Sequence, residues 1–300
     1  MSKKRLHAYI ALLTTAVIWG ISGPVIKHTL HFLPPFTFLF YRFFIVALFC
    51  LPILLYLWKK SKISFQDFPK LFLLGLMSTT INLSLVFFGF ERTTALDGTL
   101  LSSVTPIFIV IGGALFFKDK VTRFERIGLL VVLLGAFITV IQPLLEKGLF
   151  AQQNLLGNLL VLMAGLQWTT YVLLAKDDLK RHSPLAITAS AGIVGLLTFF
   201  PLAFLEQGGA IFNLEPLFIN PAALLGVGYM AILSYVLAYF FYNFGISKIE
   251  VSEAAIFAYL QPVFAAPFAV LWLKEVVTLP FLFGASVIAL GVFLSEYKRV

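Results

Sequence analysis

The sequence predicts an all-α membrane protein of ten transmembrane helices, arranged as two inverted five-helix repeats around a central cavity. Three observations carry this prediction: the composition, a series of apolar segments of helical length, and a motif that occurs twice. Of the 300 residues, 60% are hydrophobic and only 12% are charged. A soluble domain usually carries roughly 25% charged residues, so most of this surface must face something other than water.

Ten segments have the length that a helix needs to cross the membrane, roughly 20 mainly apolar residues for about 30 Å of hydrocarbon. In chain order they cover residues 8–28, 35–58, 69–90, 94–117, 123–142, 155–175, 183–205, 219–245, 251–273 and 277–297. The first has the basic start and apolar core of a secretion signal. Because further apolar segments follow it, we interpret it as a retained first span.

The lysines and arginines give the direction of the spans. With a cytoplasmic N terminus, the inner segments hold most of them, at 3–5, 59–70, 118–126, 176–181, 248 and 298–299. The outer segments hold only Lys27, Arg92, Lys147 and Lys274. Basic residues near spans stay on the cytoplasmic side. The pattern therefore predicts a multi-pass protein of the cell membrane with both termini cytoplasmic.

One motif appears twice, as "TPIFIVIGGALFFKDKVT" from Thr105 and as "QPVFAAPFAVLWLKEVVT" from Gln261. The same offset aligns Gly128 with Gly284, Gly135 with Gly291, Asp97 with Glu253 and Asp119 with Glu275. We therefore expect two repeats, in residues 1–145 and 150–300. Because five spans is an odd number, the second copy enters the membrane from the opposite side. Inverted repeats of this kind are typical of transporters, although a duplication kept only for stability is an alternative.

These motifs resemble the EamA-type branch of the drug/metabolite transporter superfamily. The resemblance rests on Trp19-Gly20, on Tyr41-Arg42-Phe43, on the repeated Pro-x-Phe and Lys-acid-x-Val-Thr pattern, and on the four glycines. It implies a five-plus-five helix fold around a central cavity and the transport, mostly outward, of amino acids and other small metabolites. The chain departs from the family pattern at Asp119, where glutamate is usual. In the second half, Thr169 follows the tryptophan in place of glycine, and Ala191 replaces the arginine.

Pro106 and Pro262 lie near the middle of the fourth and ninth spans. Proline removes a backbone hydrogen bond and kinks a helix, so both helices are expected to bend around a shared cavity. A fixed bend for packing is the alternative. Arg42 is the one basic residue deep inside a span and marks a transport pathway. It is a candidate for binding a substrate carboxylate, or else it pairs with Asp97 or extends to the interface.

Asp97 and Glu253 occupy equivalent places in the first turns of their helices. Acids there are favoured by the helix dipole, and the alternative is a gate or proton site at each face. Polar and aromatic residues near mid-depth are expected to line the cavity. They are Trp19, Ser22, Arg42, Asn82, Thr105, Gln167, Trp168, Tyr171, Tyr239 and Gln261.

The sequence also argues against several functions. It has neither a nucleophile with its base nor a phosphate-binding loop, so we expect no enzyme, no cofactor and no catalytic residue. One cysteine, Cys50, provides no disulfide, and no metal site is expected. The basic residues form short clusters between spans, so we expect lipid and not nucleic acid as the partner. The four repeated glycines indicate close helix packing, with a homodimer contact as the alternative.

The sequence thus predicts a secondary active or facilitative transporter of small metabolites that works by alternating access. One deep arginine, few acids and many aromatic residues favour an exported amino acid or a related compound. The alternative is a multidrug or nucleotide-sugar carrier of the same fold. A nucleotide-sugar carrier would be expected to hold more deep basic residues than Arg42 alone.

Overall fold

The computed structural model describes residues 3–60, 63–116, 123–147, 152–251, 254 and 256–296. Within these ranges all regular structure is helical. The α-helices and the short 3₁₀ and π segments, marked η, are α1 (Lys3–Thr29), α2 (Pro35–Lys59), η1 (Phe65–Asp67), α3 (Phe68–Gly75), η2 (Leu76–Ile81), α4 (Asn82–Arg92), α5 (Ala95–Ser102), α6 (Thr105–Phe116), α7 (Arg123–Lys147), α8 (Gln152–Asp178), α9 (Pro184–Gln207), η4 (Gly208–Phe212), α10 (Glu215–Ile219), α11 (Pro221–Gly228), η5 (Tyr229–Leu237), α12 (Ala238–Lys248), η6 (Ile256–Leu260), α14 (Gln261–Leu271) and α15 (Leu279–Glu296).

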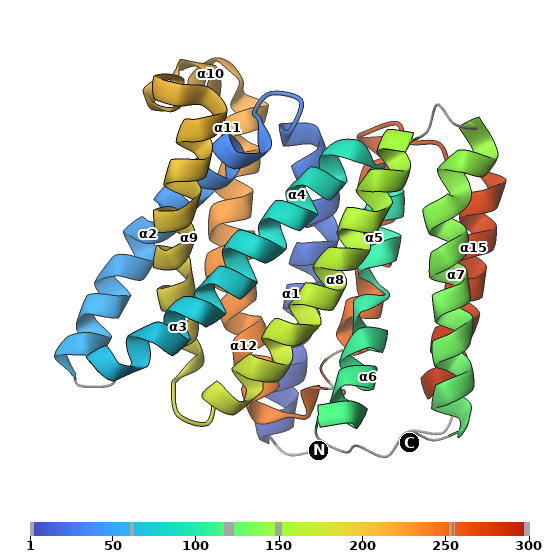
Figure 1. Cartoon of the computed structure of the whole chain (residues 1–300), viewed down its shortest axis with the longest axis horizontal. Coiled ribbons are helices and arrows are strands. Elements are labelled where there is room, and N and C mark those ends of the chain that lie inside the picture. Colours follow the sequence, from blue (N-terminus) through green and yellow to red (C-terminus); the bar gives the residue numbers. More distant parts are fainter. Residues whose placement is uncertain are drawn as a thin grey trace.

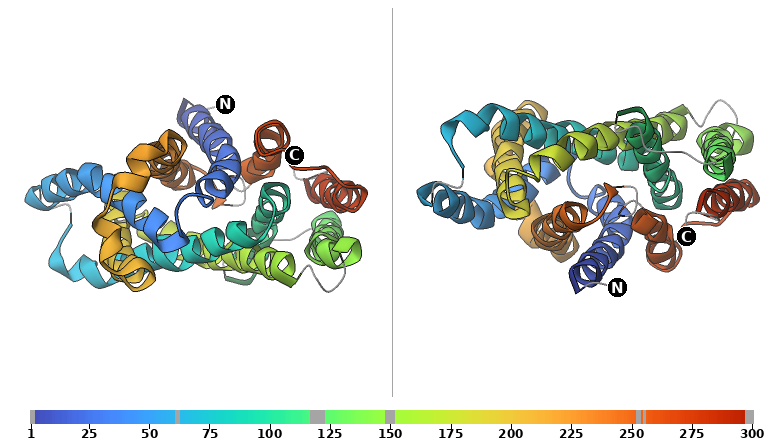
Figure 2. Two further views of the ribbon diagram at one scale, coloured as in Figure 1. Left: turned by 90° about the horizontal axis from the view of Figure 1, so that it is seen from above. Right: turned by 90° about the horizontal axis from the view of Figure 1, so that it is seen from below.

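The helices stand side by side as a bundle with an elongated cross-section (Figures 1 and 2). In Figure 2, α2 lies near one end of this cross-section, and α7 lies beside α15 at the other. Helix α1 begins and α15 ends at the lower edge of Figure 1. The turn between α4 and α5 lies at the upper edge, so the bundle has two distinct ends.

Each of the ten predicted spans contains a helix. In the described part of the chain, 7 helices are long and apolar enough to cross a membrane. They are Arg5–Thr29, Pro35–Lys59, Phe65–Arg92, Ala95–Phe116, Asn154–Asp178, Pro184–Phe212 and Pro221–Lys248. Three shorter apolar helices, Arg126–Thr139, Ile256–Leu271 and Leu279–Leu294, correspond to the fifth, ninth and tenth predicted spans.

Helices α7 and α15 form a close pair in which glycine lets the backbones touch. A Cβ atom added at Gly135 would lie 2.8 Å from the amide nitrogen of Ile288, and one at Gly291 would lie 2.6 Å from that of Val132. These two contacts are equivalent under the offset of the sequence repeat. The glycines therefore serve packing within the chain, as expected for small residues between membrane helices.

Helices α2 and α9 form a second close pair. A Cβ atom added at Gly195 would lie 2.4 Å from the ring of Phe43, and one at Gly192 would lie 2.8 Å from the sulfur of Cys50. The carboxylate of Glu206, near the end of α9, accepts hydrogen bonds from the backbone nitrogens of Phe36 (3.1 Å) and Thr37 (2.7 Å). The pair is thus held both along its length and at one end.

The fourth and ninth predicted spans are broken where only a kink was expected. Helix α5 ends at Ser102 and α6 begins at Thr105, with Pro106 as its second residue. In the second half, the 3₁₀ segment η6 gives way to α14, in which Pro262 is again the second residue. Proline suits the first turn of a helix because its missing N–H has no intrahelical partner there. Each proline therefore starts a new helix rather than bending an existing one.

Two lysines at equivalent positions of the sequence repeat, one in each half, donate hydrogen bonds to backbone carbonyls at the C-terminal end of a helix. The Nζ atom of Lys27 donates to the carbonyl oxygens of Phe90 (3.0 Å) and Glu91 (3.1 Å) at the end of α4. The Nζ atom of Lys176 donates to those of Ile246 (2.6 Å) and Ile249 (2.8 Å) at the end of α12. Each lysine thus supplies a donor where the last turn of a helix leaves its acceptors free.

We expect Gly291→Ala to destabilise the protein by about 1–3 kcal/mol, because the added methyl group meets backbone atoms of α7 that cannot rotate away. Thermal unfolding in detergent, followed by circular dichroism, measures the effect. Gly228→Ala is the matched control, since a Cβ atom there meets nothing within 4 Å. Equal melting temperatures for the two variants would contradict close α7–α15 packing.

Candidate functional site

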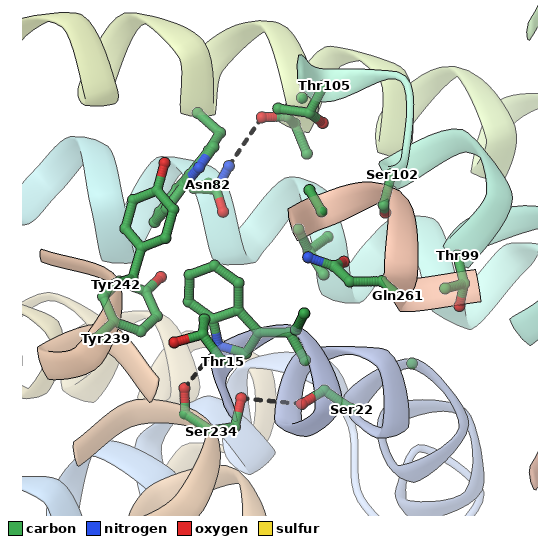
Figure 3. A pocket seen from close by; sticks show the side chains of 18 of the residues that line it. Thr15, Ser22, Asn82, Thr99, Ser102, Thr105, Ser234, Tyr239, Tyr242 and Gln261 are labelled. Carbon is green, nitrogen blue, oxygen red and sulfur yellow. Dashed lines mark hydrogen bonds between the residues drawn. The ribbon is translucent and has the colours of Figure 1, made fainter. Parts of the chain in front are cut away.

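A cavity of about 170 Å³ lies within the bundle, and residues of α1, α2, α4, α5, α6, α8, η5, α12, η6 and α14 line it. Its walls are mainly apolar, and the neutral polar side chains that line it come from both halves of the chain (Figure 3). The one charged side chain among the described lining residues is Arg42, and none of these residues carries a carboxylate. The cavity thus combines an apolar wall with a single positive charge.

Most of the residues expected to line a cavity do line this one. They are Trp19, Ser22, Arg42, Asn82, Thr105, Trp168, Tyr239 and Gln261, together with Pro106. Several make fixed contacts across the wall. The Nδ2 atom of Asn82 donates to the carbonyl oxygen of Ala164 (2.9 Å), and the hydroxyl of Ser22 donates to that of Ser234 (3.1 Å).

Gln167, Tyr171 and Pro262 are not among the residues that line the cavity. The Nε2 atom of Gln167 donates to the carbonyl oxygen of Met77 (2.7 Å). The hydroxyl of Tyr171 donates to Oδ1 of Asn243 (3.1 Å) in a buried contact between α8 and α12. In this part of α8 the cavity is lined by Ala164, Gly165 and Trp168, whereas the side chain of Gln167 bonds the backbone of η2.

Arg42 is buried, with 1% of its surface exposed. Its guanidinium carbon lies 5.5 Å, 5.9 Å and 5.7 Å from the ring centres of Phe43, Phe87 and Tyr235. Its Nε and Nη1 atoms have no hydrogen-bond partner in the described chain. The pairing with Asp97 that the sequence left open is therefore not what Arg42 does. Cation–π contacts stabilise such a charge by about 0.5–2 kcal/mol each, but they leave its N–H donors unsatisfied.

Four aromatic side chains from three helices form one cluster beside the cavity. The ring centres of Trp19 lie 5.6 Å from Trp168, 5.4 Å from Tyr239 and 5.3 Å from Tyr242. Trp168 lies 5.6 Å from Tyr239 and 5.5 Å from Tyr242. Trp19 and Trp168 are repeat counterparts, so the cluster joins the two halves. It gives the cavity a rigid aromatic wall.

The sequence does not reveal the π segments η2 and η5, which interrupt the third and eighth predicted spans. They fall at overlapping places in the repeat, and residues around each are bonded by side chains of the aromatic cluster. The Nε1 atom of Trp19 donates to the carbonyl oxygen of Ser234 (3.0 Å), and the hydroxyl of Tyr239 donates to that of Ser78 (2.8 Å). Ser78 and Ser234 are themselves repeat counterparts. Single-turn π bulges occur frequently at functional sites.

Five polar residues line the cavity without having been predicted, namely Thr15, Thr99, Ser102, Ser234 and Tyr242. A signal for some of them exists in the sequence. Thr99 and Ser102 precede Thr105 at intervals of three, and Tyr242 follows Tyr239 at the same interval. Residues three apart share a helix face, so the predicted members of each series could have identified the others.

Asp97 does not line the cavity. It is buried in the first turn of α5, and its backbone nitrogen donates to Oγ1 of Thr94 (2.9 Å), the residue that caps this helix. Its repeat counterpart Glu253 lies outside the described residues. Groups of three or more potential metal ligands are absent from the described part of the chain.

The chain matches the model of the EamA-like transporter family twice, over residues 6–141 and 155–297. An uncharacterized transporter of Archaeoglobus fulgidus is 27% identical over 299 residues, which cover 98% of each chain. The uncharacterized transporter YyaM of Bacillus subtilis is 25% identical over 87% of this chain and 84% of its own. One solved crystal structure shares the fold at a TM-score of 0.68 and 15% identity, over 97% of this chain and 96% of that one.

The two family matches together cover most of the chain and both of its halves. The relatives named above are transporters along nearly the same length. The protein is therefore a multi-pass membrane transporter and not an enzyme, and it belongs to the EamA-like transporter family of the drug/metabolite transporter superfamily.

Proposed function

We propose that the protein is a secondary active or facilitative carrier that exports amino acids or related small carboxylates by alternating access. In this proposal, ten spans form two inverted repeats, with domain boundaries at residues 1–145 and 150–300. The central cavity is the substrate site, and it opens in turn to each face of the membrane. The outward direction of net transport rests on the family resemblance.

The inverted arrangement is supported by contacts that occur twice. The Gly135–Ile288 and Gly291–Val132 contacts are equivalent, and they require α7 and α15 to run in opposite directions. The lysine caps made by Lys27 and Lys176 are equivalent as well. Two related halves of opposite direction can exchange conformations and open a site between them alternately to each side.

The observation that carries the substrate class is Arg42. Its buried N–H donors lack partners in the described chain, and an unsatisfied buried charged group is costly. A substrate carboxylate satisfies both the charge and the donors, because a guanidinium presents a planar fork that matches two carboxylate oxygens. The aromatic wall supplies the apolar surface that a side group of the substrate would contact.

The same features make the alternative substrates less suitable. A carrier of lipophilic cations gains from an acid in its cavity, and the described lining residues include none. A nucleotide sugar carries phosphate charge together with a polar nucleoside and sugar, whereas the described lining residues offer a single cation and a mainly apolar wall. A small amino acid with an apolar side group matches that single positive charge and the aromatic wall.

Two further parts of the proposal concern protons and orientation. Asp97 and Glu253 are candidate gate or proton sites. For Asp97 this is supported by its burial in the first turn of α5. The excess of basic residues in the segments on one side supports cytoplasmic N and C termini in the cell membrane.

We expect Arg42→Gln to reduce transport of amino acids at least tenfold, because loss of a buried partner of a carboxylate costs about 2–5 kcal/mol. Uptake of radiolabelled amino acids into proteoliposomes, with and without a pH gradient, measures the loss. The corresponding amino acid amides lack the carboxylate, so they should be poor substrates of the wild-type protein.

Arg126→Gln is the matched control, since Arg126 is exposed on α7 and remote from the cavity lining. It should keep at least about half of the wild-type rate. Unchanged amino acid transport in Arg42→Gln, or transport of lipophilic cations or sugar nucleotides in place of amino acids, would overturn the substrate class while leaving the fold intact.

The proposed orientation predicts which connections an impermeant maleimide reaches. In a Cys50→Ala background, Gly209→Cys should react in intact cells, because the connection after α9 faces outward. Ser64→Cys should react only after the cells are permeabilised, because the connection after α2 faces the cytoplasm. The opposite pattern would reverse the predicted direction of every span.

A further inference from the structure

The Lys-acid pair of the second motif copy, Lys274-Glu275, has no part in the proposed substrate site. In the structure it lies just beyond the end of α14 and reaches α5. The carboxylate of Glu275 accepts hydrogen bonds from the backbone nitrogens of Ala95 (2.6 Å) and Leu96 (2.9 Å). A side chain from the second half therefore caps the first turn of a helix in the first half.

We propose that Glu275 is a positioning residue for transport: its carboxylate holds α5 against α14 while the cavity is closed at this end, and it releases α5 when this end opens. This proposal rests on the proposed alternating access. It concerns the end of the bundle at which α4 meets α5, the upper edge in Figure 1.

The hydrogen bonds at the start of α5 show why the contact matters. The first four N–H groups of a helix have no intrahelical partner. Here Glu275 bonds those of Ala95 and Leu96, and the side chain of Thr94 bonds that of Asp97 (2.9 Å). Because Ala95 is fully buried and Leu96 nearly so, release of Glu275 requires water to enter and replace it.

The turn that presents Glu275 has an unusual backbone. Lys274 has a positive φ of 58°, a conformation that favours glycine. The amide nitrogen of Glu275 donates to the carbonyl oxygen of Ala269 (3.1 Å). This bond helps to hold the left-handed residue in place. Such strain persists only where surrounding contacts hold it, and it is common at switch positions.

The helix that Glu275 holds is separable from the rest of its span. Helix α5 has 8 residues and is separated from α6 by the break at Ser103 and Val104. On its other side, the turn to α4 is held by Lys27, which interacts electrostatically with Glu275. Lys27 thus bonds the α4 side of this turn, and Glu275 bonds the α5 side. When these hydrogen bonds break, α5 can move as a short unit.

Movement of α5 would open the cavity directly. Gly23, Phe90 and Thr99 all line it, from α1, α4 and α5. They are in close contact, since a Cβ atom added at Gly23 would lie 2.6 Å from Oγ1 of Thr99 and 3.0 Å from the ring of Phe90. Displacing α5 separates Thr99 from Gly23 at this end.

Cysteine labelling tests the proposal without any substrate, so its outcome is independent of the substrate class. In a Cys50→Ala background, Ser102→Cys places a thiol in the cavity wall on α5. We expect Glu275→Ala to raise the labelling rate at least about fivefold with an impermeant maleimide added from the side on which Glu275 lies. Glu275→Gln, which keeps one acceptor oxygen, should give an intermediate rate and serves if the alanine variant does not fold.

Glu206→Ala is the matched control, because Glu206 caps α2 with the same kind of two-nitrogen contact but joins helices that pack along their lengths. It should leave the labelling rate within about twofold of that of the parent protein, which carries Cys50→Ala and Ser102→Cys and keeps Glu275. Lys274→Gly relieves the positive φ without removing the carboxylate, and it should label no faster than that parent. No increase in Glu275→Ala and Glu275→Gln, or an equal increase in Glu206→Ala, would overturn the proposal.

Discussion

Backbone N–H and C=O groups within a hydrocarbon layer must find partners inside the protein, because no water is available there. An unbroken helix meets this requirement by itself, whereas a broken one does not. The described part of this bundle contains two broken spans and two π segments, and side chains from elsewhere in the chain bond backbone groups at several irregular places and helix ends. Lys27 and Lys176 serve helix C termini, Glu275 serves a helix N terminus, and Trp19 and Tyr239 serve carbonyl groups of the π segments. At each of the helix ends and π segments named here, a distant part of the chain supplies the polar group that the backbone needs.

These side chains come from elsewhere in the chain, and that arrangement joins the two halves. Glu275 of the second half bonds α5 of the first, and Trp19 of the first bonds Ser234 of the second. The aromatic cluster adds ring contacts between the same halves. The close pairs α7–α15 and α2–α9 also combine one helix from each half. The two sequence repeats are thus not two folding units side by side, because each completes the backbone hydrogen bonding and the packing of the other.

The helical segments and the repeat could be predicted from the sequence because both depend on local apolar length and on spacing. The same holds for Trp19, Arg42, Asn82 and Gln261, which are polar or aromatic residues at mid-depth and do line the cavity. The directions in which the side chains of Gln167 and Tyr171 point could not be predicted. Their position along the span gives their depth in the membrane, but not which face of the helix is turned toward the cavity. The π segments and the break after α5 were missed for a different reason. The π segments are bonded by distant side chains such as that of Tyr239, and these contacts exist only once the helices are packed. The break after α5 has no marker in apolar length or spacing.

Arg42 has no counterpart in the second half, where Ala191 occupies the equivalent place. If the two halves were fully equivalent, an empty carrier would have two conformations of equal free energy, one open to each side of the membrane. If the two halves alternate as proposed, a charge present in only one of them removes that degeneracy, and the unloaded carrier spends more of its time facing one compartment. Its half-saturation concentration then differs between the two sides of the membrane. For a facilitative carrier the maximal rates must differ in the same ratio, because the protein cannot change the equilibrium distribution of its substrate.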